Sequence, residues 1–239
     1  MASQTPAASS LKDKLIIALD VPNAREARDL VRRIGDEGLF YKVGLQLFAA
    51  EGPGIVRDLV HSGKKVFLDL KFHDIPNTVA GAVKSASELG VYMLTVHATG
   101  GSKMLNAAAH AADKKVRVIA VTMLTSVGEP EMTELGYQAK SVEEQVLRLA
   151  RLAQNSGCDG VVASPLEISG LRKTLGNKML IVTPGIRPAG SKADDQSRVA
   201  TATDAIRSGA NHLVIGRPIT GATDPSSAAR GFLDEIALA

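Results

Sequence analysis

Short apolar runs alternate with longer amphipathic stretches along most of the chain. The runs are rich in Val, Ile and Leu, which predicts strands over 14–20, 39–44, 65–71, 91–97, 116–122, 159–164, 179–185 and 212–216. The stretches between them place apolar residues at helical spacing, as in 23–35 and 141–157. Several stretches end in a glycine before the next strand, which predicts left-handed helix caps at Gly35, Gly63, Gly90, Gly157 and Gly209.

Eight predicted strands separated by helices indicate a parallel sheet, because a helical connection returns the chain to the same end of the sheet. The count of eight favours a closed (β/α)8 barrel, the α/β TIM-barrel fold, as a single domain over residues 11–239. The alternative is an open doubly wound sheet. Its usual glycine-rich turn after the first strand is missing, since Asp20 is followed by Val-Pro-Asn-Ala.

The composition narrows the possible partners. Aromatic residues make up 3% of the chain, the formal net charge is +3 and no Lys/Arg-rich run occurs, so we expect no nucleic-acid partner. A small positive balance is compatible with an anionic metabolite. No apolar stretch approaches the roughly 20 residues that span a bilayer, so we expect no membrane contact. Residues 1–10 are small and polar, and we expect a disordered lead-in rather than a signal peptide.

The chain has one cysteine, Cys158, and therefore no internal disulfide. This usage fits a reducing compartment, and we expect a cytoplasmic protein. Because Cys158 precedes a strand-like run, we interpret it as a buried, unreactive thiol rather than a nucleophile.

Polar side chains gather where the predicted strands end. In barrel enzymes the active site lies at these carboxyl-terminal strand ends. The residues at or just after the ends are Asp20, Lys42, Asp69, Lys71, Asp74, His97, Thr125, Ser126, Arg187, Gly216 and Arg217. The strand starts show no comparable set, and this asymmetry predicts a site at one end of the barrel.

The third predicted strand carries the most informative segment, Val-Phe-Leu-Asp-Leu-Lys-Phe-His-Asp. Side chains two residues apart on a strand share a face, so Asp69 and Lys71 are expected to point the same way. Charges that face a barrel interior are costly unless they are paired, and a cluster of Lys42, Asp69, Lys71 and Asp74 would pair them. The alternative is a solvated strand end with incidental charges, since the spacing Asp-x-Lys-x-x-Asp alone is a weak signal.

A separate signal points to phosphate. Barrels often hold phosphate in the loops after strands seven and eight, beside a short extra helix. Arg187 follows the seventh predicted strand, and Gly216 and Arg217 follow the eighth, at the start of a short helical turn. A guanidinium offers a planar fork of donors to a dianion. The alternative is that both arginines merely occupy exposed loops.

The motifs IALD, YKVG, DLKFHDIPNTV, VTMLTS, TPGIRP followed by DDQ, and VIGRPIT together resemble the orotidine 5'-phosphate decarboxylase family of the bacterial, single-function type. The resemblance covers nearly the whole chain outside its first residues. It implies conversion of orotidine 5'-phosphate to UMP and CO2 in de novo pyrimidine biosynthesis. It also implies chemistry without cofactor or metal, and a homodimer with shared active sites.

The resemblance further implies a role for each matching residue. Lys71 protonates C6 of the pyrimidine. The residues that complete its charge array are Lys42, Asp69 and Asp74, the last contributed by the second subunit. The residues expected to bind substrate are Asp20 and Lys42 at the ribose hydroxyls, Ile75 and Thr78 across the subunit interface, Thr125 and Ser126 beside the pyrimidine, and Arg187, Gln196, Gly216 and Arg217 at the phosphate. Residues 187–198 are the expected lid, while His73 and His97 are weaker candidates for substrate contact.

Two other functions stay open on the sequence. Sister barrel enzymes, 3-keto-L-gulonate 6-phosphate decarboxylase and hexulose-phosphate synthase, share the Asp-x-Lys-x-x-Asp strand but use Mg2+ with a carboxylate near the end of strand two. Lys42 stands there in this chain and would repel a metal. A catalytically silent phosphosugar- or nucleotide-binding barrel is the second alternative, and the retained lysines and aspartates argue against it.

Overall fold

The computed structural model describes residues 11–188 and 200–239. The expected lead-in over 1–10, the expected phosphate ligand Gln196 and most of the expected lid therefore lie outside the described residues. No helix among the described residues is long and apolar enough to cross a membrane.

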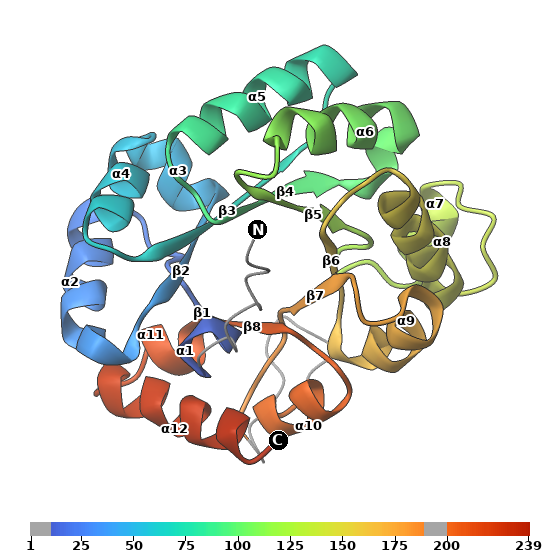
Figure 1. The fold of residues 1–239 in the computed structure, drawn as a ribbon. Helices are drawn as coiled ribbons and strands as arrows, with labels where there is room; N and C mark the ends of the chain where they lie inside the picture. Colours follow the sequence, from blue (N-terminus) through green and yellow to red (C-terminus); the bar gives the residue numbers. More distant parts are fainter. Residues whose placement is uncertain (1–10, 189–199) are drawn as a thin grey trace, which may run out of the picture.

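Eight parallel strands close into a barrel in sequence order, which confirms the predicted (β/α)8 fold (Figure 1). The strands are β1 (Leu15–Ala18), β2 (Phe40–Gly44), β3 (Lys65–Phe72), β4 (Met93–His97), β5 (Arg117–Val121), β6 (Gly160–Val162), β7 (Leu180–Thr183) and β8 (His212–Ile215). Closure is completed by pairing of β8 with β1, so the open sheet is wrong. The strands β1, β5, β6, β7 and β8 end before the apolar runs that predicted them, because the last residues of these runs leave the ladder at the barrel mouth, whereas β2 and β4 start later than predicted and β3 extends to Phe72.

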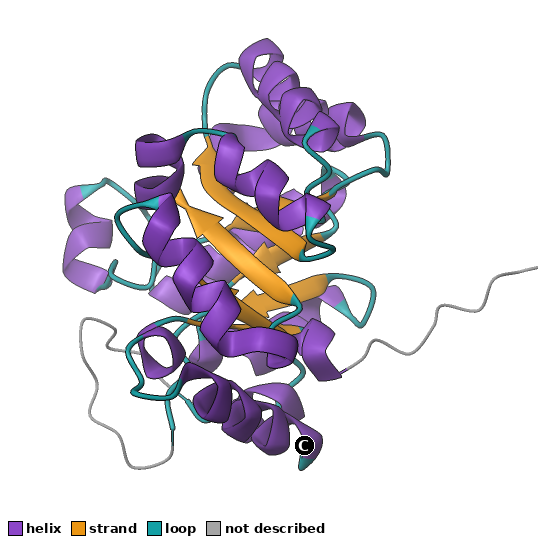
Figure 2. Ribbon diagram, turned by 90° about the vertical axis from the view of Figure 1, so that its left-hand side faces the viewer, coloured by secondary structure: helices purple, strands orange, loops and turns teal. Residues whose placement is uncertain are grey.

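Helices surround the barrel as an outer layer (Figures 1 and 2). The longer ones are α2 (Ala24–Ile34), α4 (Gly54–His61), α5 (Pro76–Glu88), α6 (Gly101–Ala112), α8 (Val142–Asn155), α9 (Ile168–Leu175) and α12 (Pro225–Ala237). The shorter ones are α1 (Leu11–Lys14), α3 (Leu45–Glu51), α7 (Glu129–Glu134), α10 (Ala202–Arg207) and α11 (Arg217–Thr220), with single 3-10 turns η1 (Gly35–Glu37), η2 (Ala98–Gly100) and η3 (Pro165–Glu167).

Local sequence signals set the helix ends. The side chains of Asn23 and Ser141 accept backbone N–H groups of the first turns of α2 and α8. All five glycines predicted as caps have positive φ, from 61° at Gly35 to 110° at Gly209, so this prediction is confirmed.

The barrel interior has an apolar layer beneath a polar one. Ile16, Phe40, Phe67, Met93, Ile119 and Val182 form a buried inner cluster, while a larger cluster fills the space between strands and helices. Two residues further along their strands, Phe40 is followed by Lys42, Phe67 by Asp69 and Met93 by Thr95. Side chains two residues apart on a strand share a face. The strand faces that form the buried inner cluster therefore also carry the polar groups at the barrel mouth.

The base of the barrel corrects the expectation that strand starts carry no polar set. Lys65 Nζ lies 2.5 Å from Asp13 Oδ1 and 4.6 Å from the centre of the Tyr92 ring. Arg117 Cζ lies 4.3 Å from the same ring, and Nδ1 of the buried His212 lies 2.8 Å from the carbonyl oxygen of Asp13. These residues are scattered in the sequence without a motif, and only the common starting level of the strands brings them together.

Cys158 is buried at the entry to β6, as predicted. Burial, reinforced by the neighbouring carboxylate of Asp159, raises the pKa of its thiol to about 12. The thiolate that would act as a nucleophile is therefore strongly disfavoured at neutral pH.

Candidate active site

A cavity of about 490 Å³ opens at the carboxyl-terminal ends of the strands. Its walls include side chains from opposite sides of the barrel. The predicted residues that line it are Asp20, Lys42, Asp69, Lys71, Thr125, Ser126, Arg187, Gly216 and Arg217. Residues separated by nearly 200 positions in the chain are thus gathered around one space, as the barrel topology predicts.

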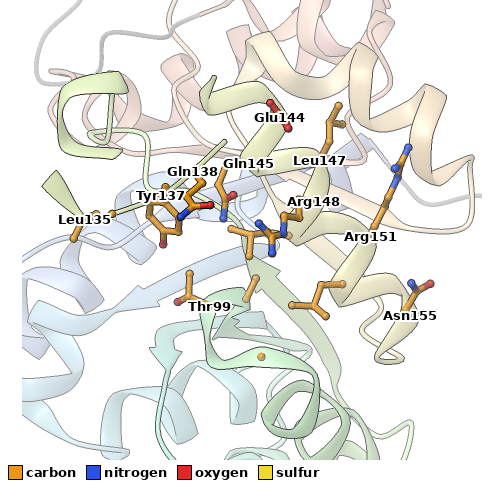
Figure 3. Close-up of a pocket in the computed structure, with 15 residues that line it drawn as sticks. Thr99, Leu135, Tyr137, Gln138, Glu144, Gln145, Leu147, Arg148, Arg151 and Asn155 are labelled. Carbon is orange, nitrogen blue, oxygen red and sulfur yellow. The ribbon is translucent and has the colours of Figure 1, made fainter. Parts of the chain in front are cut away.

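A second, larger hollow of about 1090 Å³ lies on the flank of the barrel, between η2, α8 and residues 135–138 (Figure 3). Arg148, Arg151 and Glu144 of α8 line it, together with Tyr137. None of the residues predicted for the site lines this hollow. The mouth cavity is therefore the better candidate despite its smaller volume, because it combines strand-end position with paired lysines and aspartates.

Charges at the mouth form a chain. Lys42 Nζ lies 2.7 Å from Asp20 Oδ1 and 3.8 Å from Asp69 Oδ2, and Lys71 Nζ lies 2.9 Å from Asp69 Oδ1. Lys42 is only 8% exposed, and a buried ammonium requires such partners. Aspartates and lysines therefore alternate in a row of ion pairs that runs across the ends of three strands. The row ends at the ammonium of Lys71, which lines the cavity.

Asp69 and Lys71 meet as predicted, but regular strand alternation is not the reason. Lys71 has φ of 51°, in the left-handed region, and the pairing between β3 and β4 shifts between Leu68 and Phe72. Thr95 of β4, which no sequence motif marks, is fully buried and hydrogen-bonded to both residues. Its only sequence signal is its place on the inward face of β4, two residues after Met93.

Asp74, Ile75 and Thr78 lie outside the mouth cavity of their own chain. All three are exposed, and the side chain of Asp74 accepts the N–H of Ile75 at 2.6 Å, just before α5 begins. Asp74 therefore does not join Lys42, Asp69 and Lys71 within its own chain, and its expected place in the site of a second subunit stays a prediction. The chain turns outward at His73 to start α5, and this turn carries the carboxylate away from Lys71.

The two weaker histidine candidates contact one another rather than the cavity. The rings of His73 and His97 stack with centroids 5.4 Å apart, and His97 Nδ1 lies 2.7 Å from Thr99 Oγ1. Burial, and then the positive charges of His73 and Lys71, lower the pKa of His97. This favours a neutral ring that supports the β3–α5 connection.

Two arginines line the side of the cavity formed by the last strands. Arg217 begins α11 directly after β8, and Arg187 follows β7 with its Nη1 donating to the carbonyl of Ile186 at 2.9 Å. Both line the mouth cavity with Gly216 and Thr220. Guanidinium groups on one side and the lysine–aspartate chain on the other suit an elongated ligand with an anionic end.

Comparisons with known proteins agree with this geometry. The model of the Orotidine 5'-phosphate decarboxylase / HUMPS family matches residues 13–232. The chain is 51% identical over 234 residues to the orotidine 5'-phosphate decarboxylase of Moorella thermoacetica, covering 94% of this chain and 92% of that protein. It is 52% identical over 225 residues to the enzyme of the same name from Nitrosomonas europaea, covering 94% and 97%.

A solved structure extends the comparison to three dimensions. The crystal structure of orotidine 5'-phosphate decarboxylase from Lactobacillus acidophilus superimposes with a TM-score of 0.85 at 38% identity, covering 94% of this chain and 99% of that one. Sequence, fold and the charged barrel mouth lead to one assignment: this chain belongs to the orotidine 5'-phosphate decarboxylase / HUMPS family.

Proposed function

We propose that this protein decarboxylates orotidine 5'-phosphate to UMP and CO2 in de novo pyrimidine biosynthesis, without a cofactor. The observation that carries the proposal is the Lys71 ammonium, 2.9 Å from the Asp69 carboxylate at the barrel mouth and facing the cavity that Arg187 and Arg217 also line. The relatives at about half identity, all named for this activity, support it.

Lys71 is the proposed proton donor. As the bond from C6 to the carboxylate breaks, its electron pair stays on C6 and CO2 departs. A fixed ammonium stabilises that developing negative charge without reorganisation, because its position is set before the reaction begins. The N–H bond of Lys71 then breaks as the bond from C6 to hydrogen forms, and the neutral amine regains a proton from solvent.

Asp69 has two proposed tasks. Its Oδ1 accepts a hydrogen bond from the Lys71 ammonium at 2.9 Å, which fixes the position of the ammonium before each turnover. The same carboxylate would lie beside the carboxylate of the substrate and repel it, and this repulsion is relieved when CO2 leaves.

The remaining lining residues are proposed to bind the substrate along its length. Asp20 and Lys42 hold the ribose hydroxyls, and Thr125 and Ser126 lie beside the pyrimidine. The phosphate is proposed to bind Arg187, Gly216 and Arg217, together with Gln196 from the segment outside the described residues. Phosphate is remote from C6, so its binding energy is available for positioning the reacting ring and closing the expected lid over 187–198.

A homodimer with shared sites is part of the proposal. Asp74, Ile75 and Thr78 are exposed and do not line their own cavity, and Ile75 is 68% exposed despite being a large apolar side chain. Such a segment is suited to insertion beside the site of a second copy, where Asp74 would extend the charge array of the partner and Thr78 would contact the ribose.

The magnesium-dependent sister activity is the main alternative within the barrel fold. The Lys42 ammonium lies between Asp20 and Asp69, at 2.7 Å and 3.8 Å from their oxygens. A lysine in that place neutralises the carboxylates and repels a divalent cation, which favours the cofactor-free reaction.

The test is a spectrophotometric assay that follows loss of orotidine 5'-phosphate absorbance as UMP forms. Enzyme dialysed against EDTA should retain full activity. If activity disappears on chelation and Mg2+ restores it, the sister activity is favoured. Tight binding of UMP without any turnover of orotidine 5'-phosphate would instead favour a silent binding barrel.

A further inference from the structure

The register between β3 and β4 shifts at the segment that contains Asp69 and Lys71. The pairs on either side are Leu68 with Leu94 and Phe72 with Val96. Between these pairs β3 uses three residues where β4 uses one, Thr95. A bulge of this kind interrupts the ladder, bends the strand and re-aims a side chain, and bulges are over-represented next to active sites.

Lys71 takes up the strain of this bulge. Its φ of 51° lies in a region that side chains with a Cβ disfavour. The other described non-glycine residues with positive φ, Asp113 and Lys114, lie in the turn after α6, where no cavity residue depends on them. Strained backbone persists only where its surroundings fix it, so a nearby group must hold Lys71 in place.

The hydroxyl of Thr95 holds Lys71 in place, because it acts both as a hydrogen-bond acceptor and as a donor. Thr95 Oγ1 accepts the backbone N–H of Lys71 at 2.8 Å, which replaces the ladder bond lost at the bulge. It also donates to Asp69 Oδ1 at 3.0 Å, the oxygen that accepts the Lys71 ammonium at 2.9 Å. One hydroxyl therefore fixes the backbone of Lys71 and, through Asp69, its charged end.

We infer that Thr95 is a positioning residue for the decarboxylation step, an inference that rests on the proposed function. Thr95 is fully buried and does not line the cavity, so it acts through Lys71 and Asp69 rather than on substrate. Without its hydroxyl, both partners lose a bond that water is not placed to replace. The bulge then relaxes, and the ammonium moves relative to C6.

The test compares Thr95→Val, which keeps the shape and removes the hydroxyl, with Thr95→Ser, which keeps the hydroxyl. A displacement of about 1 Å at a reacting group costs on the order of a hundredfold, so kcat of Thr95→Val should fall about a hundredfold. KM should change less than about threefold, because the ribose and phosphate contacts remain. Thr95→Ser should stay within a few-fold of wild type.

Thr122→Val is the matched control. Thr122 is also fully buried beside a strand end, but its hydroxyl donates to the Val162 carbonyl at 2.9 Å and not to Asp69. A merely structural role of buried threonine hydroxyls predicts similar melting-temperature losses and similar kcat for both valine variants. Equal kcat in Thr95→Val and Thr122→Val would overturn the inference.

Hydrogen exchange of the Lys71 amide gives a readout that needs no turnover. This amide should be protected in wild type and Thr95→Ser, and should exchange faster in Thr95→Val. If the wild-type protein shows this exchange pattern but no decarboxylase activity, the proposed function is wrong, while the role of Thr95 in fixing the Lys71 backbone still stands. Unchanged protection in Thr95→Val removes the inference itself. If Thr95→Val fails to fold, Thr95→Ala is measured in the same way.

Discussion

The mouth and the base of the barrel both place lysine, arginine and carboxylate groups near the axis, but they use them differently. At the base, Lys65 is paired with Asp13 and lies over the Tyr92 ring, which also receives Arg117. The strands there are regular. At the mouth, the ion chain ends in Lys71, whose backbone is strained and whose ammonium lines a cavity.

The difference shows that charge near a barrel axis is not by itself a sign of a site. The base residues satisfy one another and tie α1 to the strand starts, which is a structural role. The mouth combines paired charge with a left-handed lysine and a bulge, and strained backbone clusters at functional sites. The base residues also line a hollow of about 530 Å³, so backbone strain, rather than open space, is the better guide to a functional site.

Lys71→Ala should give the largest contrast between the two ends. Loss of an electrostatic group aimed at the transition state costs about a hundred- to a thousandfold, and loss of a general acid costs about a further hundredfold or more. We expect kcat to fall at least about ten-thousandfold with the fold and assembly intact. Lys65→Ala at the base should leave kcat near wild type.

The measurement is kcat of purified variants with orotidine 5'-phosphate, with circular dichroism and size-exclusion chromatography as controls. A drop of only a few-fold in Lys71→Ala would remove the proposed mechanism. A comparable loss in folded Lys65→Ala would erase the distinction between mouth and base.

Mixing subunits tests whether the mouth is completed by a second chain. Lys71→Ala and Asp74→Ala proteins should each be nearly inactive. In a random mixture, half of the dimers are mixed and each has one intact site, so activity should recover to about a quarter of wild type. No recovery after verified subunit exchange would contradict shared sites, and the exposed Asp74 would then need another role.

Arg217→Ala should have a smaller effect, on capture of the phosphorylated substrate. A charged hydrogen bond contributes about 1.5–3 kcal/mol, so kcat/KM should fall at least about tenfold. Added phosphite should partly restore turnover of the phosphate-free nucleoside if the dianion drives closure. Arg117→Ala at the base is the matched variant and should leave kcat/KM unchanged. An unchanged kcat/KM in Arg217→Ala would exclude this arginine from the site.

Residues at the base of the barrel should affect the free energy of unfolding rather than the catalytic rate. Burial is the main cause that lowers the pKa of His212 from its ordinary 6.5; Arg117 and Lys65 lower it further, and the hydrogen bond and charge of Asp13 oppose them. The folded state thus binds this proton less readily than the unfolded state. The stabilisation is complete above the ordinary pKa and is lost as pH falls below it.

Unfolding free energies at about pH 7.5 and about pH 5.5 check this sign. The loss on acidification should be smaller in His212→Gln than in wild type. His97→Gln is the matched variant at the mouth, where the lowered pKa acts in the same direction. An acid-dependent loss that is identical in wild type and His212→Gln would assign the effect elsewhere.

The barrel was predictable because its signals are local. Each apolar run, each helical stretch and each terminal glycine reports on its own segment, and eight repeats of one unit leave few topologies. The inward position of Asp69 also agreed with alternation along its own strand. These predictions needed no knowledge of which strands would be neighbours.

The features that were missed depend on contacts between segments. The bulge at Lys71 arises from the register of β3 against β4, and Thr95 gains its importance only from that register. The base set assembles from residues as far apart as Asp13 and His212. Periodicity also does not show where β3 ends and the turn to Asp74 begins, so the exposed position of Asp74 could not be read from its own segment.

Cys158 has a practical consequence for experiments on this protein. Its thiol is buried and its pKa is about 12, so alkylating reagents at neutral pH should modify it only when the region around β6 opens. A cysteine introduced at an exposed position such as Leu135 should therefore accept a spectroscopic label selectively, without replacement of Cys158. The rate at which Cys158 itself is alkylated would then report how often the barrel opens around β6.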